Sequence, residues 1–80
     1  MIRVLFFGKV ADVLGREIQV SLPGAGCTIV ELRRIIADQT GSDVLLIPGV
    51  RASLDKQVTT EEGRVTSKSE VAFFSLFSGG

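Results

Sequence analysis

Two stretches near the ends of the chain are almost continuously apolar. Residues 2–7 read IRVLFF and residues 71–77 read VAFFSLF, both rich in β-forming side chains. Uninterrupted apolar runs of this length are typical of strands that are buried on both faces. We therefore expect strands over residues 2–7 and 70–77 to be parallel neighbours in the centre of one sheet.

Alternating patterns predict further strands. Residues 17–22, EIQVSL, alternate apolar and polar positions, which predicts a strand with one solvated face near the edge of the sheet. Residues 50–54 alternate in the same way, and Asp55-Lys56 could turn the chain back toward Val58. Residues 59–69 are polar apart from Val65, which we expect to reach into the core.

The strongest pattern is that of a helix over residues 28–40. Thr28 stands at the N-cap, Glu31 completes a capping box, and Gly41 supplies a left-handed stop. The apolar stripe at helical spacing comprises Ile29, Leu32, Ile35 and Ile36. The positions expected largely outside it are Glu31, Arg33, Arg34 and Asp38. Leu32 and Ile36 should therefore be buried anchors of the helix.

The order of elements predicts an α+β fold. A short helix is expected over residues 9–14, after the first strand, and the long helix follows the second strand. A mixed sheet with this one main helix packed on one face accounts for the pattern. The 80 residues suffice for one domain.

Composition excludes several classes of function. Nine Lys and Arg balance nine Asp and Glu, so the chain lacks the basic excess of a nucleic-acid-binding domain. No apolar run reaches the length of a membrane helix. The absence of histidine argues against a zinc site and leaves the serines without an imidazole base, so an independent enzyme is not expected.

Two features could carry chemistry but favour a structural interpretation. Cys27 would precede a helix N-terminus, a place that lowers a thiol pKa, yet no second cysteine or histidine accompanies it. We expect a small half-buried side chain there, in a reducing, cytoplasmic setting. Glu61-Glu62 lies in a polar segment, where a solvated loop is the simpler interpretation.

The last residues of the chain attract most interest. Five phenylalanines fall only in the two apolar runs, and strand alternation places Phe74 and Leu76 opposite Phe77. At least one of these must point away from the core, so all three are candidate partner-interface residues. Ser78, Gly79 and Gly80 follow directly. A frayed end is one interpretation; the other is an extended arm, without side chains at its last two residues, that fits a narrow channel.

The chain resembles the small subunit of molybdopterin synthase along its whole length. The residues that carry the resemblance are IRVLFFGKVADVLG at the start, TIVELRRIIA in the helix and EVAFFSLFSGG at the end. Members of that family are sulfur carriers with the ubiquitin-like β-grasp fold. The resemblance thus implies one β-grasp domain over residues 1–80, with a functional tail at residues 77–80.

The resemblance also implies a mechanism. An ATP-dependent activating enzyme adenylates the carboxylate of Gly80, and sulfur from a persulfide donor enzyme replaces AMP to give a thiocarboxylate. The tail then enters the large synthase subunit and donates sulfur to a cyclic pyranopterin precursor. The small subunit binds no cofactor itself, and two small and two large subunits are expected to form a heterotetramer.

Three positions depart from the family pattern, and two other functions share the terminus. Ser75-Leu76 stands where the family usually has two prolines, Ser67-Lys68-Ser69 where it has Asp-Gly-Asp, and Asp55-Lys56 where it has Asn-Gly. A sulfur carrier for thiamine-thiazole synthesis and a ubiquitin-like protein modifier would both use a C-terminal glycine. A plain interaction module, in which the tail does nothing, is a further alternative.

Overall fold

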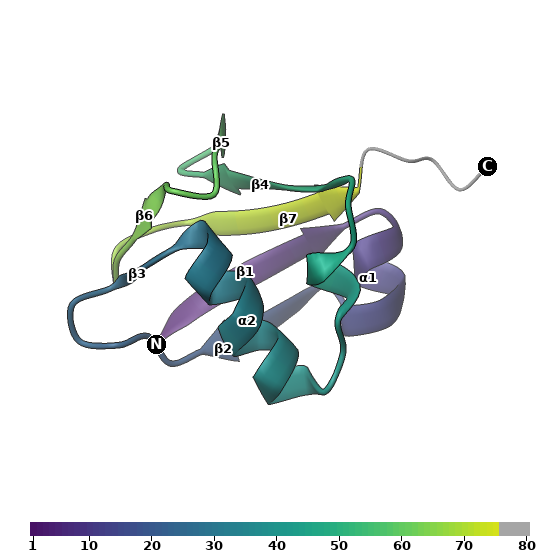
Figure 1. Ribbon diagram of the computed structural model, residues 1–80, viewed down its shortest axis with the longest axis horizontal. Coiled ribbons are helices and arrows are strands. Elements are labelled where there is room, and N and C mark those ends of the chain that lie inside the picture. Colours follow the sequence, from purple (N-terminus) through teal and green to yellow (C-terminus); the bar gives the residue numbers. More distant parts are fainter. Residues whose placement is uncertain (76–80) are drawn as a thin grey trace.

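The computed structural model describes residues 1–75, so Leu76 to Gly80 lie outside the described part. One mixed sheet of five strands forms its centre (Figure 1). In spatial order the strands are β2 (Glu17–Val20), β1 (Ile2–Phe7), β7 (Val71–Ser75), β4 (Val50–Leu54) and β5 (Gln57–Thr59). β1 and β7 are parallel, and the other neighbours are antiparallel. The prediction of two parallel central strands is confirmed, as is the edge position of β2.

In the described part of the chain the helices cover one face of the sheet, which corrects the expectation for the first strand. Ile2, Val4 and Phe6 are buried, whereas the alternate positions Arg3 and Phe7 are exposed. The continuous apolar run of residues 2–7 predicts burial on both faces, and this prediction is wrong. Its second apolar set instead lies on the face opposite to the helix, because the helices of residues 1–75 pack on the other face of the sheet (Figure 1).

The main helix, α2 (Ile29–Thr40), begins and ends as predicted. The Thr28 hydroxyl accepts a hydrogen bond from the Glu31 backbone N–H, and the Glu31 carboxylate accepts one from the Thr28 N–H at 2.8 Å. Gly41 closes the helix at φ 73°, a conformation that glycine adopts without steric cost. The capping box is therefore present in full.

The apolar stripe of α2 packs on the sheet, with one error in the prediction. Ile29, Leu32 and Ile36 are completely buried, and Ile35 is partly buried against the same core. Arg33, however, was expected largely outside the stripe and is buried as well. The core also contains a stacked pair of rings, Phe6 and Phe73, whose centroids lie 6.3 Å apart.

Short elements complete the fold. They are α1 (Lys9–Leu14), the two-stranded pair β3 (Cys27–Thr28) and β6 (Arg64–Val65), and the 3₁₀ turn η1 (Val44–Leu46). Val65 is fully buried, as predicted from its isolation among polar residues. Asp55 and Lys56 form the two-residue turn between β4 and β5 at φ 52° and 72°, so this turn is confirmed without the usual Asn-Gly. Strand, helix and turn together give the expected β-grasp arrangement.

Candidate functional site

The site predicted from the sequence lies mostly beyond the described residues. Gly80, Gly79 and Ser78 of the tail and the interface residues Phe77 and Leu76 fall outside residues 1–75. What the structure gives is the point from which they continue. The described part of β7 runs to Ser75, which pairs with Val50 at the start of β4. We call this place the tail root.

The remaining predicted interface residue, Phe74, lies at the tail root and is partly buried. It is in register with Phe7 on β1 and with Arg51 on β4. Phe73 beside it is fully buried, so alternation directs Phe74 to the face that α2 does not cover. Phe74 therefore meets the expectation that at least one of Phe74, Leu76 and Phe77 points away from the core. Its register neighbour Phe7, which the sequence did not single out, is 54% exposed.

Leu5 and Phe7 form a ridge on the uncovered sheet face. A hollow of about 480 Å³ lies between this ridge and the α1 side, where Arg16 and Glu17 border it. A second hollow of about 210 Å³ lies on the β7 side, bordered by Ala72, Ser53, Lys56 and Glu70. The sequence did not predict this ridge, because in a continuous apolar run the hydrophobicity of the residues does not show which of them face outward. We call the surface made by Leu5, Phe7, Ala72 and Phe74 the open face.

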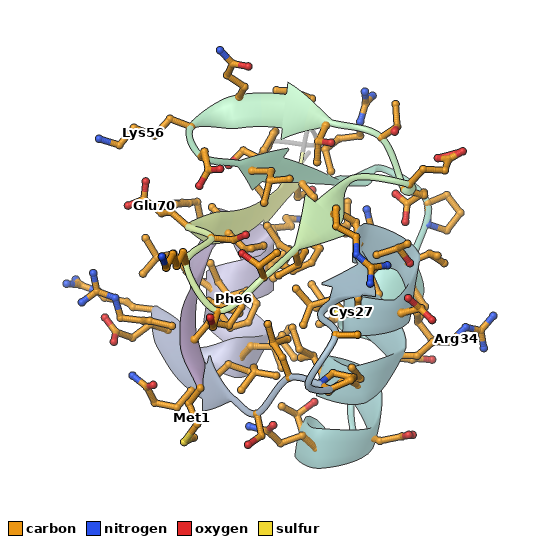
Figure 2. The ribbon with its side chains drawn as sticks, turned by 90° about the vertical axis from the view of Figure 1, so that its left-hand side faces the viewer. Met1, Phe6, Cys27, Arg34, Lys56 and Glu70 are labelled. Carbon is orange, nitrogen blue, oxygen red and sulfur yellow. The ribbon has the colours of Figure 1, made fainter. Side chains whose placement is uncertain are left out.

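Charged side chains border the open face. Register and alternation place Arg3 and Glu17 at its β2 side, where the Arg3 Nε and a Glu17 carboxylate oxygen are 3.9 Å apart. Arg51 is the register partner of Phe74. Figure 2 shows the Lys56 and Glu70 side chains on the side of the sheet away from α2. The open face is thus an apolar strip with a mixed but cation-rich border of the kind that suits a protein partner.

A cluster around Arg33 lies near the tail root on the other side of the sheet. The guanidinium donates hydrogen bonds to the carbonyls of Leu45 and Val50, at 2.6 and 2.8 Å, and two to Glu61. It also lies 5.2 Å from the centre of the Phe73 ring. The loop carboxylate Glu61 was predicted to be merely solvated; instead it is half exposed and anchors this cation.

The Arg33 cluster had a signal in the sequence. Position 33 is four residues after Ile29 and three before Ile36, so it falls within the apolar stripe by spacing alone. Because arginine carries a charge, Arg33 was nevertheless expected on the exposed side of the helix. A carboxylate and two carbonyls from other segments accept hydrogen bonds from Arg33 and make its burial possible, and these partners could not be identified from spacing.

Cys27 has no features of a reactive thiol. It is buried, more completely than the half-buried side chain expected from the sequence. Burial raises the pKa of its thiol, and the neighbouring Glu31 carboxylate adds to this rise while Arg64 opposes it. The nearby helix N-terminus therefore does not make Cys27 a nucleophile, and the structural interpretation holds.

Within residues 1–75 the acidic and thiol side chains do not gather into a metal centre. No group of three Cys, Asp or Glu in this part of the chain could hold a metal ion. Over the same range no helix is long and apolar enough to cross a bilayer. What the described residues offer is a surface: the open face, the Arg33 cluster behind it, and the tail root between them.

The comparisons with known proteins give the fold. No protein-family model matches the chain, and no curated protein matches it by sequence. A crystal structure of SAMP1 from Haloferax volcanii is similar over 98% of this chain and 97% of that one, with a TM-score of 0.77 and 18% identity. A second structure, of H. volcanii small archaeal modifier protein 1, covers 91% and 93%, with a TM-score of 0.73 and 16% identity. At these identities the likeness establishes the α+β, β-grasp fold of the chain.

Proposed function

We propose that the protein is a sulfur carrier whose reactive group is the terminal carboxylate of Gly80. The observation that carries the proposal is the position of β7. This central strand ends at the border of the open face, and the five residues that follow Ser75 include Gly79 and Gly80. Five extended residues span about 16 Å. Such an arm can enter a partner's active site while the domain docks outside it.

The chemistry requires partners at every step. In an activating enzyme, a Gly80 carboxylate oxygen attacks the α-phosphorus of ATP, and pyrophosphate leaves. The terminal sulfur of a persulfide then attacks the carbonyl carbon of the adenylate, AMP leaves, and an acyl disulfide forms. A partner thiol cleaves its S–S bond, which releases the thiocarboxylate and leaves a disulfide on the partner. In this scheme the chain supplies only the terminus, and the partners supply the catalytic groups.

The acceptor we propose is the cyclic pyranopterin precursor of the molybdenum cofactor, held by a large synthase subunit. In this assembly two small and two large subunits form a heterotetramer. The support is the resemblance carried by the opening IRVLFFGKVADVLG and the ending EVAFFSLFSGG. The open face supports it too, since Phe7 and Phe74 offer aromatic anchors beside the tail root.

A second candidate is a ubiquitin-like protein modifier. The specific observation in its favour is that a structure similar to this chain carries the name modifier protein. A modifier would use the same adenylate but transfer Gly80 to an amine of a target protein, forming an isopeptide bond. A carrier for thiamine-thiazole synthesis shares the thiocarboxylate and differs in its acceptor.

Two measurements on the full chain separate these candidates. Intact mass of the protein isolated from its host tests whether Gly80 is the C-terminus and whether a fraction is heavier by about 16 Da, since sulfur replaces one oxygen. Co-purification identifies the partner. A large subunit that converts the pterin precursor supports the proposal. A ladder of conjugates on other proteins, without the heavier species, would favour the modifier and overturn it.

A further inference from the structure

A second apolar surface lies on the helix side of the tail root. Val30 on α2, and Leu46 and Ile47 after it in the chain, keep exposed fractions of 40, 47 and 52%. Together with Pro48 they border a hollow of about 370 Å³. Adjacent exposed aliphatic side chains around a hollow mark an interaction site more often than scattered ones do. We call this hollow the helix-side groove.

The groove lies next to the tail root but not on the open face. Val50 forms one end of its lining and is the strand partner of Ser75. In Figure 1 the segment between η1 and β4 runs up to the end of β7, on the side where α2 packs. The tail root therefore has an apolar surface on each side: the open face, with Phe7 and Phe74, and the groove.

The Arg33 cluster holds the groove in shape. Arg33 lines it and bonds the carbonyls of Leu45 and Val50, so both ends of the segment 45–50 are tied to α2. Glu61 ties the loop after β5 to the same guanidinium. A groove fixed in this way loses little conformational entropy when it binds.

The polar group that the groove presents to a partner is the Glu61 carboxylate. Its side chain is 48% exposed and keeps acceptor capacity beyond its two bonds to Arg33, whereas the Arg33 side chain is only 8% exposed. The other cation nearby in sequence, Arg34, lies outside the groove lining, and Figure 2 shows it pointing outward from the helix. A ligand of the groove should therefore combine an apolar side chain with a Lys, Arg or N–H donor.

The surface area that a specific interface buries indicates what kind of partner covers the groove. A specific interface buries about 800 Å² on each side, close to one sixth of the 4921 Å² surface of this structure. Three aliphatic side chains and a proline are too few to supply that area. Val50 at one end of the groove pairs with Ser75, which follows Phe74 of the open face, so one partner that wraps around this end of β7 and contacts all three surfaces would reach it.

We propose that the helix-side groove is a second docking surface for the protein that binds the tail. An apolar side chain of that protein fills the groove, and a cationic or N–H donor beside it meets Glu61. The partner then holds Ser75 and Val50 of the tail root from both sides. This inference rests on the proposed function for the identity of the partner.

The test uses the full chain and the partner that co-purifies with it. Ile47→Asp and Ile47→Lys introduce opposite charges at a half-exposed site, and Ile47→Met keeps the apolar character. Ser67→Asp and Ser67→Lys are matched controls on an exposed residue between β6 and β7. We expect both charged Ile47 variants to weaken binding at least about tenfold, and the lysine variant more because it faces the partner's donor. Ile47→Met and both Ser67 variants should stay within about twofold of the wild type.

The outcomes are distinct. Wild-type affinity in both charged Ile47 variants overturns the groove proposal, as does a change in self-association without a change in partner affinity. An unchanged unfolding midpoint in these variants excludes misfolding as the cause of weaker binding. Deletion of Gly80 tests the proposed function separately. If that deletion abolishes sulfur transfer while the Ile47 variants bind normally, the groove proposal alone fails; if the deletion has no effect, the carrier function fails, and the affinities still decide about the groove.

Discussion

The Arg33 guanidinium and the Glu61 carboxylate form a two-point hydrogen bond, Nε to Oε1 at 2.8 Å and Nη2 to Oε2 at 2.9 Å. The two residues are 28 positions apart in the chain. Their parallel bonds use the fork of the guanidinium, which lysine could not reproduce. Because Arg33 also bonds the Val50 carbonyl, the pair links the helix and a loop to the strand that holds the tail root.

Arg33→Met should destabilise the domain much more than Arg34→Met. The substitution leaves the Leu45 and Val50 carbonyls without their donor, and each unsatisfied buried group costs about 1–3 kcal/mol. Arg34 is exposed, so its substitution should stay within about 0.5 kcal/mol. Urea denaturation of both variants measures the difference. Equal midpoints would mean that water replaces the guanidinium at both carbonyls.

Leu32→Ala should cost about 2–5 kcal/mol, because Leu32 is fully buried against the sheet and the cavity left behind cannot collapse completely. That is a large share of the stability of a domain this small. Val30→Ala, two residues earlier and 40% exposed, is the matched control and should change the midpoint little. Similar losses in both variants would show that helix propensity, not core packing, sets the cost.

Stability should fall in acid partly through Glu31. The Thr28 backbone N–H and then the Thr28 hydroxyl donate to its carboxylate, and these bonds lower the pKa of Glu31. A lowered folded-state pKa gives a contribution that is complete above the unfolded value of about 4.3 and is lost as pH falls through the folded value. Glu31→Gln should flatten the pH dependence of the unfolding midpoint below about pH 5. Superimposable wild-type and variant curves would contradict this.

Local patterns predicted the parts of the fold that depend on neighbouring residues. The capping box at Thr28 and Glu31, the Gly41 stop and the turn at Asp55-Lys56 are all set within a few residues, and all are present. The exposure of Phe7 could not be read from the apolar run of its strand. It depends on how many layers cover the sheet, which is a property of the whole chain.

The two sides of the tail root also differ in whether a local sequence pattern could predict them. Phe74 was identified from strand alternation near the terminus, a local pattern. The Arg33 cluster required partners 12, 17 and 28 residues away, and no spacing rule connects them. The predicted residues Leu76 to Gly80 lie outside the described part of the chain and stay predictions.

Two adjacent phenylalanines on β1 should behave in opposite ways. Phe6 is 2% exposed and stacks on Phe73, so Phe6→Ala should cost about 3–5 kcal/mol of stability. Phe7 is 54% exposed beside Phe74, so Phe7→Ala should leave folding nearly unchanged and weaken partner binding. Denaturation and isothermal titration with the co-purified partner check both. Unaltered affinity of Phe7→Ala would remove the open face from the interface.

Phe77→Ala is expected to resemble Phe7→Ala, with a greater loss of affinity than of stability.

Deletion of Gly80, or addition of one residue after it, should abolish sulfur transfer and leave the fold intact. The reactive group is the terminal carboxylate, and one added residue moves it roughly 3.3 Å along an extended arm. A displacement of about 1 Å can already cost on the order of a hundredfold in rate. Gly79→Val should be more harmful than Gly80→Ala, because a branched side chain is the harder one to admit to a narrow channel.

The assay for these tail variants separates activation from delivery. Thiocarboxylate formation is followed by intact mass with activating enzyme, ATP and a persulfide donor, and sulfur transfer is followed with the pterin precursor and the large subunit. Ser67→Gly changes an exposed residue before the start of β7, at the opposite end of that strand from the tail root, and this control should be normal in both steps. A chain that lacks Gly80 and still transfers sulfur at the wild-type rate would exclude the terminal carboxylate as the carrier group. The two glycines would then revert to the interpretation of a frayed chain end, and the open face would have to be explained by binding alone.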